Sequence, residues 1–492
     1  MSSSSTNRIN LFSFSGKMRT LHLTWIAFFI SFLVWFNHAP LLSHIRDSFG
    51  LSKQEIATLL ILNVALTIPA RIIIGMTVDR FGPRMVYSLL LAVSALICFV
   101  FASSTSFEML AISRFLLGFV GAGFVIGIRL IGEWFPAKQV GVAEGIYGGW
   151  GNFGSAAAAM SLPSITLLFG GEDGWRYATA LTGVIALGYS VIFFRLARDT
   201  PEGATYFKPN KSGAMEVSSR GDMVLYAIMK LPLFLTIALL AWKLGPNNID
   251  ILSDMTADLI YLGLVVLYFY QLYHIVSVNR SILREPAPEF QRYKFKQIAV
   301  LNLAYLVTFG SELAVVSMLP LFFMDTFSLS GVEAGILASA YAFMNLVSRP
   351  GGGLMSDRYG RKKTLMIFIG FLAIGYFGMS QITADWWLPA AVLMAMGCSF
   401  FVQAGEGAVF AVVPLVKRRM TGQVAGMVGA YGNVGAVCFL TVLSFVSPKI
   451  FFLVICASAI FTWIAIAVFM EEPEGEMAEI LPDGTVELIT VK

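Results

Sequence analysis

The sequence has few of the residues that build catalytic or metal-binding sites. Charged residues make up only 13% of the 492 positions, and the chain has four histidines and four cysteines. The cysteines lie in apolar runs without paired spacing, so neither a disulfide framework nor a zinc site is indicated. The formal net charge of +4 is too small and too dispersed to suggest nucleic-acid binding. We therefore expect no enzyme, no cofactor and no metal.

Long apolar runs, by contrast, fill the chain. Hydrophobic residues make up 57% of it and its mean hydropathy is +0.75, which is more than a soluble core of this size needs. Runs of about 20 residues, each long enough to cross a hydrocarbon core as a helix, recur from Leu21 to Met470. A transmembrane barrel would instead show alternating segments of about 10 residues. The sequence therefore predicts an all-α polytopic membrane protein.

The apolar runs predict fourteen helices, or twelve if the seventh and eighth runs are re-entrant or interfacial. The predicted helices cover residues 21–45, 54–78, 85–103, 107–132, 139–168, 175–196, 223–244, 257–278, 297–324, 331–355, 363–381, 386–415, 422–446 and 450–470.

Basic residues concentrate in the even-numbered loops, and the positive-inside rule places these loops and both termini in the cytoplasm. The protein is accordingly expected in the cell (inner or plasma) membrane, surrounded by the lipid bilayer. The predicted parts are a cytoplasmic N-terminus (1–20), an N-terminal half (21–197), a cytoplasmic linker (198–296) with an extra hairpin (223–244 and 257–278), a C-terminal half (297–470) and an acidic, solvated cytoplasmic tail (471–492).

An internal repeat relates the two halves. Arg71, Gly75, Asp79, Arg80 and Gly82 recur 278 residues later as Arg349, Gly353, Asp357, Arg358 and Gly360. A second pair of segments, GIYGGWGNFG and GMVGAYGNVG, aligns Asn152 with Asn433 at an offset of 281. Two homologous six-helix halves that alternate access to a shared site explain this pattern.

The first repeated segment carries a family resemblance. GMTVDRFGPR and GGLMSDRYGRK resemble the loop motif of the major facilitator superfamily, which implies the major facilitator fold. Asp79 with Arg80, and Asp357 with Arg358, are candidates for a conformational latch between the halves. The alternative is that these charges only anchor helix ends at the membrane face.

Arg71 and Arg349 are the candidate anion ligands. Each lies eight residues before its loop aspartate, or about 12 Å along a helix, near the membrane midplane. An arginine there costs about 2.5 to 3.5 kcal/mol on insertion scales. Two guanidiniums on equivalent helices could clamp one planar oxyanion. Alternatively they pair with Glu312, Glu406 or backbone carbonyls and only hold helices together.

The second repeated segment indicates a small substrate. Glycines bring helix backbones close together, and the packing candidates are Gly148, Gly151, Gly429 and Gly432. These segments resemble the paired signatures of the nitrate/nitrite porter family, and LARDTPEGATYFKP from Leu196 resembles the linker of its high-affinity uptake branch. The resemblance implies that the anion is bound by Arg71, Arg349, Asn152, Asn433, Phe32, Phe124, Tyr305 and Phe309.

Glu312 is the candidate proton carrier, because an unpaired carboxylate in an apolar run tends to be protonated. A helix–helix salt bridge is its alternative role, and Glu144 and Glu406 are reserve candidates. We therefore expect proton-coupled uptake of nitrate or nitrite by a monomer. The alternatives are a nitrate/nitrite exchanger, a facilitator for another small or organic anion and, from a different class, a membrane anion sensor. The sequence does not separate nitrate from nitrite.

Overall fold

The computed structural model describes the chain outside residues 1–9, 136, 171–172, 204–213, 285–291, 418–420, 473–475, 481–485 and 491–492. The side chains of residues 76, 79, 137–141, 414, 421–422, 476–480 and 486–490 also lie outside the description. Fourteen helical spans in the described chain are long and apolar enough to cross a membrane. The prediction of fourteen helices is confirmed, and the fallback of twelve is wrong.

The two halves contain corresponding helices. The N-terminal half is built from α1 (Gly16–Phe36), η1 (Ala39–Leu41), α2 (Leu42–Phe49), α3 (Lys53–Ala65), α4 (Thr67–Phe81), α5 (Pro83–Ala102), α6 (Phe107–Leu117), η2 (Gly118–Ala122), α7 (Gly123–Trp134), α8 (Ala137–Phe169) and α9 (Gly174–Leu196). The C-terminal half is built from α12 (Phe295–Phe327), α13 (Gly331–Phe343), α14 (Asn345–Tyr359), α15 (Arg361–Met379), α16 (Leu388–Val416), α17 (Thr421–Leu443) and α18 (Pro448–Phe469).

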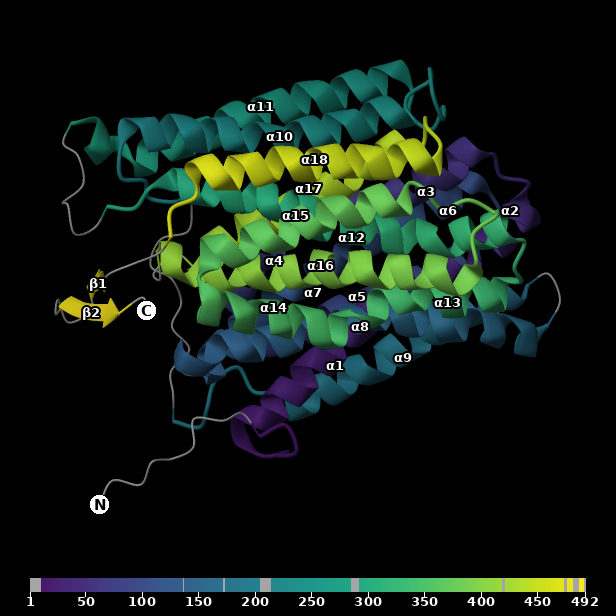
Figure 1. Ribbon diagram of the computed structural model, residues 1–492, viewed down its shortest axis with the longest axis horizontal. Coiled ribbons are helices and arrows are strands. Elements are labelled where there is room, and N and C mark those ends of the chain that lie inside the picture. Colours follow the sequence, from purple (N-terminus) through teal and green to yellow (C-terminus); the bar gives the residue numbers. More distant parts are fainter. Residues whose placement is uncertain are drawn as a thin grey trace.

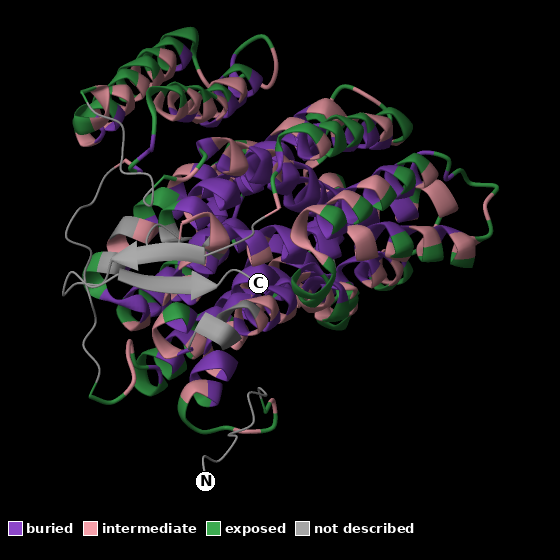
Figure 2. Ribbon diagram, turned by 60° about the vertical axis from the view of Figure 1, so that its left-hand side comes forward, coloured by how far each residue is buried: buried purple, intermediate pink, exposed green. Residues whose placement is uncertain are grey.

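The helices run side by side along the bundle, and the start of α1 and the end of α18 lie at the same end of it (Figure 1). We call this end the terminal side and the opposite end the far side. Buried residues fill the middle of the bundle, and exposed ones cover its rim (Figure 2). Because the exposed rim is rich in large apolar side chains, it suits a lipid environment.

Two spans are broken at equivalent positions. The second is split into α3 and α4 at Leu66, and the tenth into α13 and α14 at Met344. Pro69 contributes to the first break, because its ring conflicts with the carbonyl of residue 65 and it has no N–H to donate. Arg71 and Arg349 each follow their break by five residues. Broken helices at midplane depth are typical of transporter binding sites.

The extra hairpin consists of α10 (Arg220–Leu244) and α11 (Asp254–Val278), followed by η3 (Arg280–Leu283). α10 packs against α3, α12 and α17, whereas α11 packs mainly on α10. Figure 2 shows the pair at the edge of the bundle. Both helices satisfy the length and hydropathy of a membrane span.

The tail is more ordered than a purely solvated segment. Strands β1 (Glu476–Ile480) and β2 (Val486–Thr490) pair antiparallel, with Glu476 opposite Thr490. Ahead of them, Glu471 contacts Lys294 at 2.8 Å and Lys296 at 2.6 Å. Lys294, together with Lys296, holds the pKa of Glu471 below its ordinary value. The start of the tail is therefore tied to the terminal side of the bundle.

Candidate functional site

Arg71 enters the centre of the bundle from α4. Its side chain is buried, with 1% exposure, and Nη1 donates to the carbonyl of Gly429 on α17. Among the residues that the structure describes, Nε and Nη2 of Arg71 have no hydrogen-bond partner. Buried donors are nearly always paired in folded proteins. Two adjacent unpaired donors on one planar guanidinium therefore point to a ligand with two acceptor atoms.

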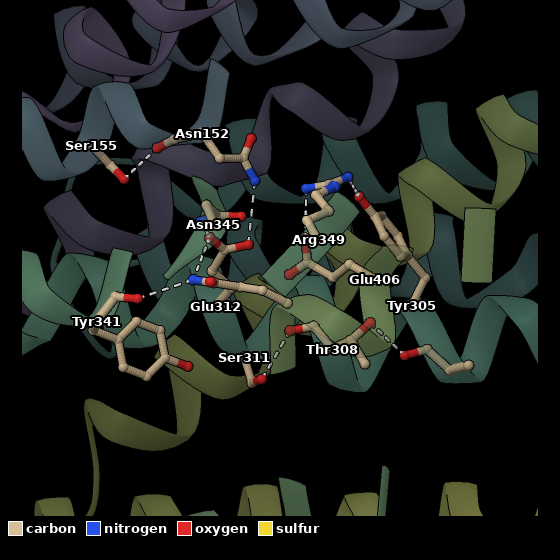
Figure 3. Close-up of polar contacts among 12 residues, drawn as sticks. Asn152, Ser155, Tyr305, Thr308, Ser311, Glu312, Tyr341, Asn345, Arg349 and Glu406 are labelled. Carbon is tan, nitrogen blue, oxygen red and sulfur yellow. Dashed lines mark hydrogen bonds and ion pairs between the residues drawn. The ribbon is translucent and has the colours of Figure 1, made fainter. Parts of the chain in front are cut away.

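Arg349 enters the same region from α14, with 3% exposure. Its Nη1 forms an ion pair with Glu406 of α16 at 2.6 Å, and its Nη2 donates to the Tyr305 hydroxyl of α12 at 3.0 Å. Figure 3 shows Arg349 between these two partners. A carboxylate from another helix thus compensates the buried charge, as buried ions require.

Two aromatic rings link the arginines. Phe124 of α7 and Phe309 of α12 each contact both guanidinium carbons, with distances to the ring centroids of 5.2 to 5.8 Å. Cations at this distance from an aromatic ring are attracted by it. The structure therefore brings together Arg71, Arg349, Phe124 and Phe309, as the family resemblance implied.

Phe124 and Phe309 belong to a larger group of aromatic side chains, which we call the aromatic wall. This wall includes residues that sequence reasoning missed. Phe410 of α16 contacts Tyr305 at 5.0 Å and Phe124 at 5.4 Å. Phe28 of α1 contacts Phe124 at 5.7 Å and lies 281 residues before Phe309, so the repeat offset could have identified it. Phe410 carried no such signal.

Phe32, the residue expected in this wall, lies one helical turn from Phe28. Its ring contacts Phe28, Trp35 and Phe36 at 4.9 to 5.5 Å. It therefore supports the wall from behind.

The signature glycines pack across the interface between the halves. A Cβ on Gly148 of α8 would lie 3.0 Å from Nε of Arg349, and one on Gly429 would lie 2.7 Å from Nη1 of Arg71. Each half thus keeps space for the arginine of the other half. Gly151 and Gly432 instead leave room for rings of their own half, Gly151 for Phe28 and Gly432 for Phe309.

The two signature asparagines occupy equivalent places. Nδ2 of Asn433 donates to the carbonyl of Gly429 at 3.2 Å, four residues earlier. Asn152 does the same to Gly148 at 3.2 Å when its amide is oriented so that its oxygen accepts from Nη1 of Arg349 at 2.7 Å. Because an amide's orientation is assigned from its partners, this orientation, which satisfies both ends and matches Asn433, is preferred. In the opposite orientation Asn152 donates to Glu312 at 3.4 Å.

Glu312 faces amides rather than an arginine. It is 1% exposed on α12, and it accepts hydrogen bonds from Asn345 and, at 3.5 Å, from Gln403. Figure 3 shows its carboxyl group toward Asn345. In the described part of the chain, Glu406 rather than Glu312 forms the ion pair with an arginine. The two carboxylates therefore have different surroundings.

The latch candidates lie at the terminal side. Asp357 pairs with Arg361 at 3.2 Å within its own half, while Arg80 and Arg358 lie over the rings of their neighbours Phe81 and Tyr359. The side chain of Asp79 lies outside the described residues.

Two carboxylates that sequence reasoning missed cap helices in this region. Asp199 accepts from the backbone N–H of Arg84 at 2.7 Å, at the start of α5. Glu472 accepts from those of Arg361 and Lys362 at 2.6 and 2.8 Å, at the start of α15. Carboxylates are favourable at helix N-termini.

The two halves are in close contact at the level of the arginines and on the far side. At the level of the arginines, a Cβ on Gly149 of α8 would lie 2.5 Å from the carbonyl of Asn345 on α14. On the far side, a Cβ on Gly335 of α13 would lie 2.4 Å from the carbonyl of Ala159 on α8. The halves are therefore closed on the far side of the buried arginines.

Comparison with known proteins agrees with this architecture. The model of the Major Facilitator Superfamily matches residues 24–278 and 301–488. The "Nitrate/nitrite transporter NrtP" of Picosynechococcus sp. is 47% identical, over 95% of this chain and 96% of its own length, and that of Nostoc punctiforme is 44% identical, over 95% of each. The solved xylose transporter XylE from E. coli, at 16% identity, covers 93% of this chain and 100% of its own, with a TM-score of 0.60.

Two repeated halves around a buried cationic site are typical of a membrane transporter, and the matched relatives are named as transporters, not enzymes. The chain belongs to the Major Facilitator Superfamily and, within it, to the nitrate/nitrite porter family. The predicted fold class and family are confirmed.

Proposed function

We propose that this protein takes up nitrate or nitrite through its cell membrane by alternating access, coupled to protons. The observation that carries the proposal is that two donors on Arg71, Nε and Nη2, have no partner among the described residues, in a buried site between Phe124 and Phe309. Nitrate is a small planar anion, and two of its oxygens match the fork of a guanidinium. Relatives named "Nitrate/nitrite transporter NrtP" support the same substrate.

The charges of the site favour a monovalent anion. Arg349 is balanced by Glu406 at 2.6 Å, whereas Arg71 contacts a carbonyl and two rings. If Glu312 is protonated, the charges of the two arginines and the two glutamates of the site sum to +1. One nitrate or nitrite ion would neutralise this charge. If Glu312 is ionised, the sum is zero and a bound anion would leave an uncompensated charge in a buried site, which is unfavourable.

Proton coupling follows from this balance. A proton on Glu312 and an anion on Arg71 each raise the affinity for the other, because each removes the charge that opposes the other's binding. Entry of an anion against a negative interior costs about 2.3 kcal/mol per 100 mV. More than one proton per anion makes uptake favourable, so a second proton site besides Glu312 is required. Glu406 and Glu144 remain candidates for it.

Closure of the two halves would complete the binding site. Gly148 admits Arg349 and Gly429 admits Arg71, each across the interface. Separation of the halves on one side would expose the arginines to that side. We assign the terminal side to the cytoplasm, because it carries a row of basic residues that include Arg84, Lys294, Arg361 and Lys362. Transport by a monomer needs no residue from a second copy.

The test is uptake of labelled nitrate into proteoliposomes with and without an inward proton gradient. The wild type should accumulate nitrate in response to the gradient, and Arg71→Lys should lose most of this uptake. Glu312→Gln should lose the response to the gradient but still exchange nitrate for nitrite, since the anion ligands remain. The elution profile of each purified variant in size-exclusion chromatography is the control that the variant is folded.

Two results would redirect the proposal. Wild-type uptake that occurs only against internal nitrite would identify an exchanger, the activity in the name of the "Probable nitrate/nitrite antiporter NarK1" of Thermus thermophilus, a relative at 25% identity over 85% of this chain and 83% of its own length. No uptake by folded wild type under any condition would favour a facilitator for another anion.

A further inference from the structure

The extra helix α10 docks on α17 in a fixed register. Three of the contacts between them share one spacing, because in each of the three the two partners are 202 positions apart. Along each helix the contacts recur every seven residues, which is the spacing of two parallel helices packed as in a coiled coil. The pairs are the Tyr431 hydroxyl donating to the Met229 carbonyl at 2.6 Å, the Cys438 thiol with the Thr236 hydroxyl, and the Lys243 ammonium 4.3 Å from the centroid of the Phe445 ring, just beyond the end of α17.

Near the terminal side, α10 is also fixed to α12. The carboxylate of Asp222 accepts from the backbone N–H of Phe295 at 3.0 Å, and the Tyr226 ring lies 5.1 Å from the Phe295 ring. Both α12 and α17 belong to the C-terminal half. The contacts therefore make α10 a rigid part of that half.

At the far side, Lys243 reaches across to the other half. It is fully buried and donates to Oε1 of Gln54 at the start of α3. Gln54 in turn donates through Nε2 to the carbonyl of Ser444 at 3.1 Å. No carboxylate of the described residues contacts Lys243, so Gln54 and the Phe445 ring are the groups that stabilise its ammonium. A buried polar group left without its partner is costly.

We infer that α10 is a strap that holds the far-side seam closed. It moves with the C-terminal half, and Lys243 joins this half to α3 of the N-terminal half through Gln54. Opening the site to the far side separates α3 from α17 and breaks both hydrogen bonds of Gln54. The strap therefore stabilises states closed on the far side, which gives the hairpin a role that a six-plus-six repeat does not require.

The test measures exposure of the seam directly. Thr58 is buried on α3, one turn deeper than Gln54, so Thr58→Cys reports opening of the far side. In purified protein in lipid nanodiscs, the rate of maleimide labelling at residue 58 is followed by mass spectrometry. Adding Lys243→Met should raise this rate by roughly tenfold, the effect of losing one hydrogen bond to a charged group.

Lys230→Met is the matched control on the same helix, because Lys230 lies over Tyr226 within α10, 5.3 Å from the centroid of its ring. Its labelling rate should equal that of Thr58→Cys alone. Gln54→Met removes the acceptor from the opposite half and should raise the rate as Lys243→Met does, while the double variant adds little more. Unchanged labelling in folded Gln54→Met, or an equal rise with Lys230→Met, would overturn the proposal.

Discussion

Arg71 and Arg349 occupy equivalent positions in the two halves but have different partners. Both follow a helix break by five residues, and both pack against a signature glycine of the opposite half. Arg349 has three side-chain partners, Glu406, Tyr305 and Asn152, whereas Arg71 keeps two donors without a partner among the described residues. A symmetric sequence thus yields an asymmetric site, in which one arginine is positioned and the other is available to an anion.

The largest effect on stability is expected from removing the carboxylate that pairs with Arg349. Glu406→Gln leaves a buried guanidinium without its carboxylate, so the free energy of unfolding in detergent should fall by about 3 to 5 kcal/mol. Added nitrate should restore part of the loss by neutralising the arginine. The comparison variant is Glu471→Gln, whose exposed pairs with Lys294 and Lys296 should change stability by less than about 1 kcal/mol. Equal stability of the two variants would remove the assigned role of Glu406.

A smaller effect is expected from filling the space beside Arg71. The Cβ of Gly429→Ala would meet Nη1 of Arg71 at 2.7 Å, so the guanidinium must shift, and overpacking of this kind costs about 1 to 3 kcal/mol. The apparent affinity for nitrate in uptake assays should fall roughly tenfold. Gly426→Ala, whose Cβ meets nothing within 4 Å, should behave as wild type. Loss of affinity in both variants would indicate a general effect on α17.

The smallest effect is expected in the aromatic wall. Phe28→Leu removes a ring that contacts Phe124 at 5.7 Å, so nitrate affinity should fall by the equivalent of about 0.5 to 1.5 kcal/mol. Phe32→Leu should change affinity less, because Phe32 contacts Phe28 and lies behind the wall. The measurement is the apparent affinity of both variants in the same uptake assay. A larger loss of affinity in Phe32→Leu than in Phe28→Leu would support Phe32 as the binding residue, as the sequence predicted.

The sequence predicted the features that repeat or that follow from hydropathy. Apolar runs gave the spans, and the offsets of 278 and 281 paired Arg71 with Arg349 and Asn152 with Asn433. The break at Met344 was not predictable, since a helical turn that opens within an apolar run leaves no change in composition. Once the break at Leu66 was known, the repeat offset of 278 would have predicted the break at Met344.

The partners of the site residues were harder to predict than the residues themselves. Glu406 and Phe410 have no counterpart of the same kind in the N-terminal repeat, because offsets of 278 or 281 lead from Glu406 to Ile128 or Val125 and from Phe410 to Gly132 or Arg129. Which of the two central carboxylates pairs with Arg349 depends on how α12 and α16 pack, and this packing is not encoded locally. The register of α10 on α17 was missed because its contacts join a helix outside the repeat to one inside it.

The most direct test of the asymmetry is equilibrium binding of nitrate to the purified protein, measured by calorimetry for wild type, Arg71→Lys and Arg349→Lys. Lysine keeps the charge but loses the fork, so Arg71→Lys should weaken binding at least about tenfold, the loss of one charge-assisted hydrogen bond. Arg349→Lys should weaken it less, because most donors of Arg349 already serve protein partners. Weaker binding in Arg349→Lys than in Arg71→Lys would contradict the account.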